Sequence, residues 1–270
     1  MLFTEKRNKI MEENTTQEIK EFKPPVSIKA AVWILIVLLM IAAISWGYSF
    51  ATNVDSYAGK ASSYTQWLTM NPIANGGCTG ENIKAGSLEA IQTAISYEYI
   101  IKLPVKLVDS EIKVMTDNPY ELKDALELIN GQVGVIVDMQ TENGNSEVTA
   151  SAVYEIIKAY KGNIAVESWD LDALKWFKDN ASSVIRGLST GQLNQAALNG
   201  FEKFLHKNML LNYKALPYYI ACDYESLPNA IISDVNKDAY VIATGITDAE
   251  TAKKATQYSD NVCIDGFSLY

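Results

Sequence analysis

The chain has 270 residues, of which 48% are apolar, so it can bury a sizeable core in one large domain or two small ones. Its formal net charge is −9 and it has no basic stripe, which argues against nucleic acid as a partner because phosphates require clustered Lys and Arg. The three cysteines, Cys78, Cys222 and Cys263, form no Cys-x-x-Cys pair or Cys/His cluster. We therefore expect buried, unpaired thiols and no zinc site.

The first element in chain order is an apolar run over residues 30–51. No charged residue occurs between Lys29 and Asp55, and about 20 apolar residues match the hydrocarbon thickness of a bilayer. Trp33 and Trp46 lie near the two ends, where amphipathic rings favour the membrane interface. This pattern predicts a transmembrane helix held in the lipid bilayer. Its length and the long segment before it distinguish it from a cleaved signal peptide.

The lysines around this run are distributed unevenly. Lys20, Lys23 and Lys29 precede it, whereas only Lys60 closely follows it. The positive-inside rule then makes residues 1–29 a cytoplasmic tail and places the C-terminal part outside the cytoplasm, as in a single-pass protein of the cell membrane. The tail is polar with few large apolar side chains, which favours disorder.

From residue 72 onward, short apolar runs alternate with helical patterns. Eight runs have the length and apolar content of strands: Pro72–Ala74, Ile100–Leu107, Val133–Asp138, Asn163–Glu167, Val184–Leu188, Leu216–Ala221, Ala239–Ala243 and Asn261–Ile264. Eight strands alternating with helices predict an α/β fold, a closed (β/α)8 TIM-type barrel over residues 72–270. Residues 52–71 are expected to form a linker, or a helix whose residues 57–68 cover the place of a missing last outer helix.

Between the strand candidates, residues 87–98, 120–130 and 148–160 place apolar side chains on one helical face. Asp170 and Asp248 stand where a helix N-cap belongs, just before LDALKWF and AETAKKA. Each of these segments is therefore expected to be a helix that packs on the barrel.

Several segments resemble the glycerophosphodiester phosphodiesterases, a family of (β/α)8 barrels, over roughly residues 72–267. The run ESWD at 167–170 is similar to the strand of that family that ends in Gln-Ser-Phe-Asp. The run AYVIATGITDAETAKKA at 239–255 resembles its penultimate strand, loop and helix. The run YSDNVCIDGF at 258–267 follows its closing pattern, with Asp260 and Asp265 in place.

The first half of the chain departs from the pattern that carries the family's chemistry. The family has Ala-His-Arg-Gly after its first strand, Glu-x-Asp on the second, then His-Asp, and Glu-x-Lys on the third. The corresponding positions here hold Asn75, Lys102, Pro104, Thr116, Asp138 and Gln140.

The resemblance implies a mechanism with two histidines and a Ca²⁺ or Mg²⁺ ion held by carboxylates. Asn75 does not titrate, and the hydroxyl of Thr116 is too weakly acidic for acid–base work near neutral pH. Lys102 would place its ammonium, as a built-in charge, where the metal should lie. We therefore expect no catalytic residues, no metal site and no cofactor.

Ligand-binding side chains in this fold lie at the C-terminal ends of the strands. The candidates for the mouth of the barrel are Asn75, Lys102, Thr116, Asp138, Gln140, Glu167 and Arg186. Lys102 and Arg186 at the mouth would favour an anionic, phosphate-bearing ligand. The single histidine, His206, is expected on the surface of a helix with no catalytic role.

The glycine-rich run NGGCTGEN at 75–82 predicts a plain turn, with a phosphate-binding loop as the alternative. For the whole chain, the first hypothesis is a membrane-anchored, extracytoplasmic glycerophosphodiester phosphodiesterase-like barrel, catalytically degenerate, acting as a binding or scaffold module or with a membrane protein partner. The alternative is an active phosphoric diester hydrolase of lipid head-group metabolism with a rearranged site.

Overall fold

The computed structural model describes residues 28–55, 62–80, 82–142, 144–190 and 198–269. The chain divides into two compact units, residues 1–46 and 47–270. In the first unit the described residues belong to one helix, α2 (Ile28–Ala51), which continues into the second unit. Its 24 residues make it long and apolar enough to cross a membrane, and none of them is buried. The predicted tail, apart from residues 28 and 29, lies outside the described residues.

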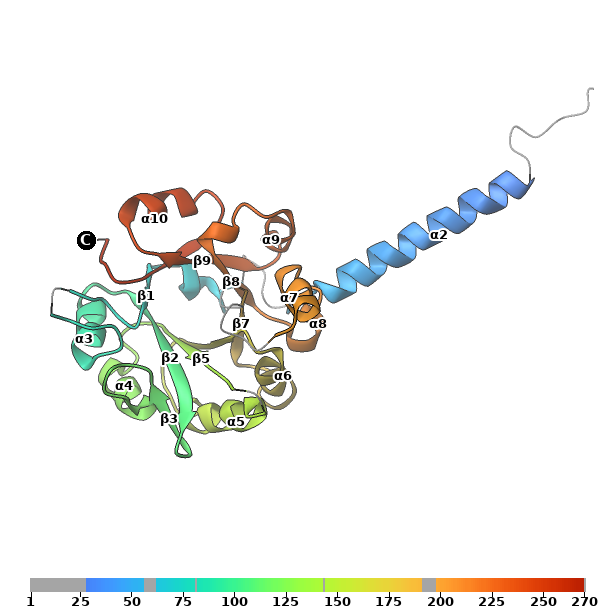
Figure 1. Cartoon of the computed structure of the whole chain (residues 1–270). Helices are drawn as coiled ribbons and strands as arrows, with labels where there is room; N and C mark the ends of the chain where they lie inside the picture. Colours follow the sequence, from blue (N-terminus) through green and yellow to red (C-terminus); the bar gives the residue numbers. More distant parts are fainter. Residues whose placement is uncertain (1–27, 56–61, 81, 143, 191–197, 270) are drawn as a thin grey trace, which may run out of the picture. The chain divides into compact units, whose positions relative to one another are not determined.

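The second unit is built on a closed ring of eight parallel strands with helices outside it (Figure 1). In ring order the strands are β1 (Ile73–Asn75), β2 (Ile100–Val108), β5 (Val135–Met139), β6 (Ile164–Ser168), β7 (Ile185–Ser189), β8 (Tyr219–Asp223), β9 (Tyr240–Ile246) and β10 (Asn261–Ile264). β1 pairs with β2 on one side and with β10 on the other, which closes the ring. The predicted (β/α)8 barrel is therefore confirmed, and each predicted strand overlaps an observed one.

A hairpin that the sequence did not reveal extends the sheet beyond the ring. β2 turns back into β3 (Glu111–Val114), and β4 (Tyr120–Glu121) pairs with β3. The turn has two central residues, Asp109 and Ser110, with φ of 50° and 68°. Two positive φ angles in a two-residue loop match the twist of a hairpin, although Asn-Gly is the usual sequence for such a turn.

Helices lie outside the ring of strands. They are α3 (Leu88–Ser96), α4 (Leu122–Ile129), α5 (Ser146–Ile157), α6 (Leu171–Asn180), α7 (Gly200–Lys207), α8 (Asn212–Ala215), α9 (Ala230–Val235) and α10 (Ala249–Ala255), with a 3₁₀ turn η3 (Tyr224–Ser226). The predicted N-caps are confirmed: the side chain of Asp170 accepts from the N–H groups of Asp172 and Ala173, and that of Asp248 from Thr251. Both caps satisfy donors that the helix leaves unpaired.

A short 3₁₀ turn, η1 (Gln66–Thr69), covers the N-terminal end of the barrel. Trp67 and Leu68 are buried there, and Asn261 at the start of β10 donates to the carbonyl of Leu68. The ring of Trp67 lies so close to Gly134, just before β5, that a Cβ there would stand 2.5 Å from it. Of the segment expected to cover a missing helix, residues 57–61 lie outside the described residues, and the rest covers this end of the barrel.

The core follows the strand pattern. Ile136 and Val241 are fully buried on β5 and β9. Cys78, Cys222 and Cys263 are all buried and unpaired, as expected. The thiols are held away from water, and burial raises the pKa of Cys222 to about 11. They are therefore inert core groups.

Candidate functional site

Four polar side chains meet inside the barrel. The strand register pairs Asp138 on β5 with Glu167 on β6, and Glu167 with Gly187 on β7. Gly187 in turn pairs with Tyr219 on β8, so these four positions form one layer across the sheet. Lys102 reaches them from β2: its Nζ donates to Oε1 of Glu167 at 2.5 Å and lies 3.2 Å from Oδ2 of Asp138. The hydroxyl of Tyr219 donates to Oε2 of Glu167 at 3.0 Å. We call Lys102, Asp138, Glu167 and Tyr219 the interior charge group.

The interior charge group is removed from solvent, with Lys102 4% exposed and both carboxylates less. Burial alone would lower the pKa of Lys102, but the charges of Asp138 and Glu167 outweigh it and hold that pKa well above its ordinary value. Burial raises the pKa of Asp138 to about 6, and the ammonium of Lys102 only partly offsets this. One ammonium thus faces two carboxylates, and no part of it is open to a ligand.

Gly187 is the residue that lets Tyr219 enter this layer. A Cβ at position 187 would lie 2.1 Å from the ring of Tyr219, which no real side chain tolerates. The tyrosine ring therefore lies directly over the β7 backbone, with its hydroxyl on Glu167. Sequence reasoning missed Tyr219 as a partner of Glu167, because which strand residues share a layer depends on the register between strands.

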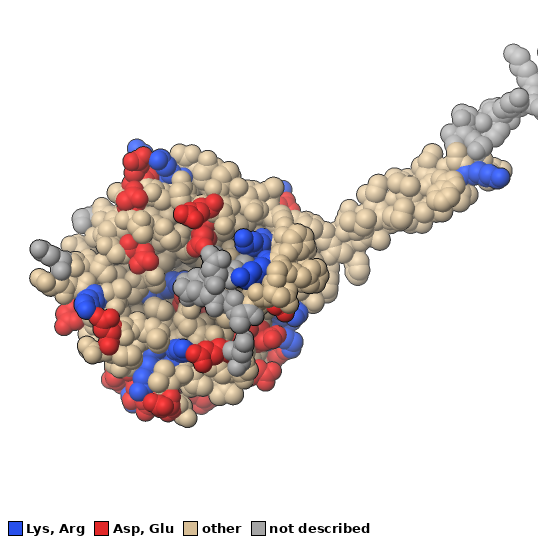
Figure 2. All heavy atoms as spheres, in the orientation of Figure 1, with Lys and Arg blue, Asp and Glu red and all other residues tan. Residues whose placement is uncertain are grey.

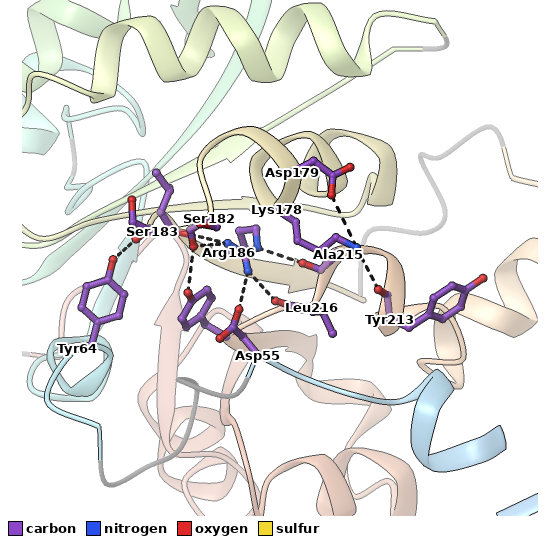
Figure 3. A network of polar contacts seen from close by, with 12 residues as sticks. Asp55, Tyr64, Lys178, Asp179, Ser182, Ser183, Arg186, Tyr213, Ala215 and Leu216 are labelled. Atoms are coloured by element: carbon purple, nitrogen blue, oxygen red, sulfur yellow. Dashed lines mark hydrogen bonds and ion pairs between the residues drawn. The ribbon is translucent and has the colours of Figure 1, made fainter. Parts of the chain in front are cut away.

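The structure contradicts the prediction that Arg186 lies at the mouth. Arg186 is the second residue of β7, next to Gly187. Successive side chains of a strand point to opposite faces, so Arg186 points outward from the barrel. Its guanidinium is fully buried and donates to Oδ2 of Asp55 at 2.8 Å and to the carbonyls of Ser182, Val184, Ala215 and Leu216 (Figure 3). Tyr218 lies against it, with the guanidinium carbon 4.8 Å from the ring centre.

The remaining candidates for the mouth of the barrel are Asn75, Gln140 and Thr116, and they differ in their positions. Asn75 ends β1 in register with Lys102, and Gln140 follows β5; both are half-buried near the top of the barrel. Thr116 lies after the β3 hairpin strand and packs beside Gly86, whose N–H donates to the carbonyl of Gly76 in the turn after β1. Lys102 and Arg186 are both buried against carboxylates, so neither offers its charge to an anionic ligand at the mouth.

Other polar groups at the C-terminal ends of the strands are engaged locally. The hydroxyl of Thr141 donates to Asp170 at 2.7 Å, and the same carboxylate caps α6. The hydroxyl of Thr244 donates to Asp223 at 3.0 Å. No sequence pattern indicates these pairs, since their partners are 29 and 21 residues apart.

The glycine-rich turn after β1 does not offer a phosphate cradle. The N–H of Gly76 donates to the carbonyl of Lys102, that of Gly77 to Ala74, and that of Gly80 to Ile83. Gly76 and Gly77 have φ of 70° and 85°, and a Cβ on either would meet the backbone of the α3 region. The plain turn is therefore the interpretation that fits.

The prediction for His206 is wrong in part. It lies on α7 as expected, but it is only 7% exposed and faces the barrel. Burial lowers its pKa below the ordinary value. The charge of Asp170, which follows β6 and caps α6, partly opposes this lowering, so His206 lies near the C-terminal end of that strand.

The interior charge group does not fit a Ca²⁺ or Mg²⁺ site. Such ions take six or more oxygen ligands, and carboxylates are the strongest of these. Here the oxygens of Asp138 and Glu167 face the ammonium of Lys102, and Pro104, in register with Asp138, has no side-chain donor. Among the described residues, no group of three or more His, Cys, Asp or Glu side chains is arranged to hold a metal ion.

The resemblance seen in the sequence extends to the three-dimensional fold. A phosphodiesterase of Oleispira antarctica, solved with the product sn-glycerol-3-phosphate, superposes with a TM-score of 0.60 at 15% identity over 74% of this chain and 94% of its own. The glycerophosphodiester phosphodiesterase of Thermotoga maritima gives 0.56 at 18% identity over 72% and 94%. That of Parabacteroides distasonis gives 0.57 at 15% identity over 72% and 92%.

These similarities define the class of the domain: a (β/α)8 barrel with the fold of the glycerophosphodiester phosphodiesterases. No protein-family model matches the sequence, and no curated protein sequence matches it. At these identities the comparison establishes the fold, and function has to be argued from the site.

Proposed function

We propose that this protein is a membrane-anchored, extracytoplasmic barrel of glycerophosphodiester phosphodiesterase-like fold that has no phosphodiesterase activity and serves as a binding or scaffold module. Its partner on this proposal is a protein of the membrane or cell surface. The interior of the barrel has a structural role, and recognition falls to the outer surface.

The observation that carries the proposal is the position of the Lys102 ammonium between the carboxylates of Asp138 and Glu167. Phosphodiester hydrolysis requires charge neutralisation together with an acid and a base. The two carboxylates are engaged by a residue of the chain itself, and Asn75 and Thr116 occupy the positions that the resemblance assigns to histidines. The one histidine, His206, is buried on α7.

The anchoring part of the proposal rests on α2. The helix is uncharged from Ala30 to Ala51 and is long enough to cross a bilayer. The lysines before it favour a cytoplasmic N-terminus, which puts the barrel outside the cytoplasm.

The catalytic part is tested with the purified full chain in mild detergent. Glycerophosphocholine and glycerophosphoethanolamine are incubated with it in the presence of Ca²⁺ or Mg²⁺, and release of the alcohol is measured. We expect no turnover above the protein-free rate, since losing one acid–base group alone commonly removes about 10²–10⁴-fold in rate.

The alternative is an active phosphoric diester hydrolase of lipid head-group metabolism with a rearranged site. Metal-dependent turnover that disappears in Asp138→Ala and persists in Asp124→Ala would establish it. Asp124 is an exposed carboxylate on α4, so its variant controls for a general effect of removing an acidic group.

A further inference from the structure

Helix α7 exposes aromatic side chains to solvent and buries its histidine. Phe201 and Phe204, three residues apart and therefore on one face, are 69% and 54% exposed. The face turned toward the barrel carries His206 instead. A helix that only covered the strands would bury its phenylalanines and expose its histidine. The exposed aromatic pair therefore indicates an interaction site on the outer surface of α7.

Contacts within the second unit place α8, which follows α7 in the chain, beside the last turn of α2. The last turn of α2, residues 47–51, belongs to the same compact unit as the barrel. Phe50 in that turn stacks on Tyr213 of α8, with ring centres 5.1 Å apart, and Asn212 donates to the carbonyl of Thr52. α8 follows α7 after four residues, and the N–H of Leu210 donates to the carbonyl of Leu205 across the connection.

The segment that follows α2 is fastened to the barrel at a second point. Oδ2 of Asp55 accepts a hydrogen bond from the buried guanidinium of Arg186 at 2.8 Å (Figure 3). The N–H of Asp55 donates to the carbonyl of Pro217. These contacts hold residues 50–55 against the α7–α8 corner. If α2 crosses a bilayer, the α7–α8 corner lies where the chain leaves the membrane interface.

The charge of the α7–α8 segment itself suits a lipid surface. Residues 200–216 contain Lys203, Lys207 and Lys214 with a single acidic residue, Glu202, in a chain whose net charge is −9. The carboxylate of Glu202 is engaged in the capping box with Asn199. In Figure 2 the surface over α7 and α8 is largely uncharged, with basic side chains along its edge. Exposed aromatics flanked by lysines are the composition of helices that lie in the membrane interface.

We propose that α7 is a second membrane contact, in which Phe201 and Phe204 insert among the head groups of the lipid bilayer and seat the barrel against it. The inference rests on the proposed anchoring by α2. Two aromatic side chains would bind a membrane weakly in isolation. The short, fastened connection to α2 raises their effective concentration at the surface, so the contact forms without a strong affinity of its own.

The test uses the full chain in vesicles of phosphatidylcholine and phosphatidylglycerol in equal parts. Phe204→Cys is labelled with an environment-sensitive nitrobenzoxadiazole dye, the three native cysteines being buried. The matched control is Leu88→Cys on α3, 45% exposed, which lies across the ring because α3 connects β1 to β2 and α7 precedes β8. Nitroxide-labelled lipid should quench the dye at position 204 several-fold more than at 88, and adding Phe201→Ser should weaken that quenching.

Flotation of the same samples after a high-salt, alkaline wash reports on α2 separately. If the chain floats and the dyes at 204 and 88 are quenched equally, α7 makes no lipid contact and the inference is overturned while the anchoring stands. If the dye at 204 is shielded from lipid by a second copy or another protein, the inference is overturned likewise. If the chain does not float, the proposed anchoring fails, and the inference fails with it.

Discussion

Lys102 is the only cation among the four members of the interior charge group, so Asp138 and Glu167 depend on it for a counter-charge. Lys102→Met keeps a similar volume and leaves two buried carboxylates facing each other. We expect it to lower the free energy of unfolding by about 3–5 kcal/mol near neutral pH, as for other broken buried ion pairs. The measurement is urea unfolding of the full chain in detergent, followed by near-UV circular dichroism.

Lys106→Met is the matched control for that variant. Lys106 lies on the same strand and pairs with Glu142, but the lysine is 31% and the glutamate 64% exposed. Exposed pairs contribute roughly 0–1 kcal/mol, so this variant should unfold close to the unaltered chain. Equal effects of the two substitutions would mean that the interior charge group does not hold the barrel together.

Asp138 gives the barrel a pH dependence whose sign can be worked out. Its pKa rises from 3.8 to about 6 on folding, mainly through burial, so the folded state retains a proton that the unfolded state gives up. This stabilisation is complete below pH 3.8 and is lost as the pH rises through about 6. At about 1.4 kcal/mol per pH unit the loss is of the order of 3 kcal/mol.

Asp138→Asn cannot ionise and should lack this pH-dependent term. The difference in unfolding free energy between the variant and the unaltered chain should therefore change in favour of the variant between pH 4 and pH 6, by roughly the amount just given. A difference that stays constant over this range would show that Asp138 has an ordinary pKa in the folded protein.

Physical reasons explain why the positions of some of these residues could be predicted from the sequence and those of others could not. Lys102, Asp138 and Glu167 were recognisable because each lies in an apolar strand run, where a charge stands out. Arg186 stood out in the same way, but one residue of register decides whether a strand side chain faces the interior or the outer helices. His206 was misplaced because α7 turns its aromatic face outward, contrary to the usual pattern.

Among the elements, η1 shows how a segment without strand or α-helix closes the barrel. Trp67 is 7% exposed and covers the N-terminal end, whereas Met70, three residues later, is 64% exposed. Trp67→Ala should cost about 3–5 kcal/mol through lost burial and the cavity left behind, and Met70→Ala should cost little. Thermal unfolding of both variants checks this. A Trp67→Ala variant as stable as Met70→Ala would remove η1 from the core.

Elements with a strong periodic pattern could be predicted, and elements that depend on turn geometry could not. The eight strands follow from apolar runs such as residues 133–138, and the N-caps of α6 and α10 from Asp170 and Asp248. The β2–β3 hairpin escaped notice because Asp109 and Ser110 adopt positive φ without a glycine. Similarly, the sequence places Trp67 in a linker, and only the fold shows that its ring packs on Gly134, 67 residues later.

For the whole molecule, the lysine asymmetry around α2 predicts the topology. A reporter enzyme that is active only outside the cytoplasm, fused after Tyr270, should be active in intact cells. The matched control fusion carries the same reporter at the N-terminus and should be inactive. Protection of a C-terminal tag from external protease in intact, wall-stripped cells would place the barrel in the cytoplasm instead.

We propose that the barrel does not bind divalent metal ions, because the carboxylates inside it form ion pairs with Lys102. Ligands that bind the folded state alone raise its stability by mass action. The most direct measurement is therefore the unfolding temperature of the full chain in detergent with and without millimolar Ca²⁺ or Mg²⁺. We expect no change with either ion. A rise in unfolding temperature that Asp138→Ala abolishes would contradict the proposal.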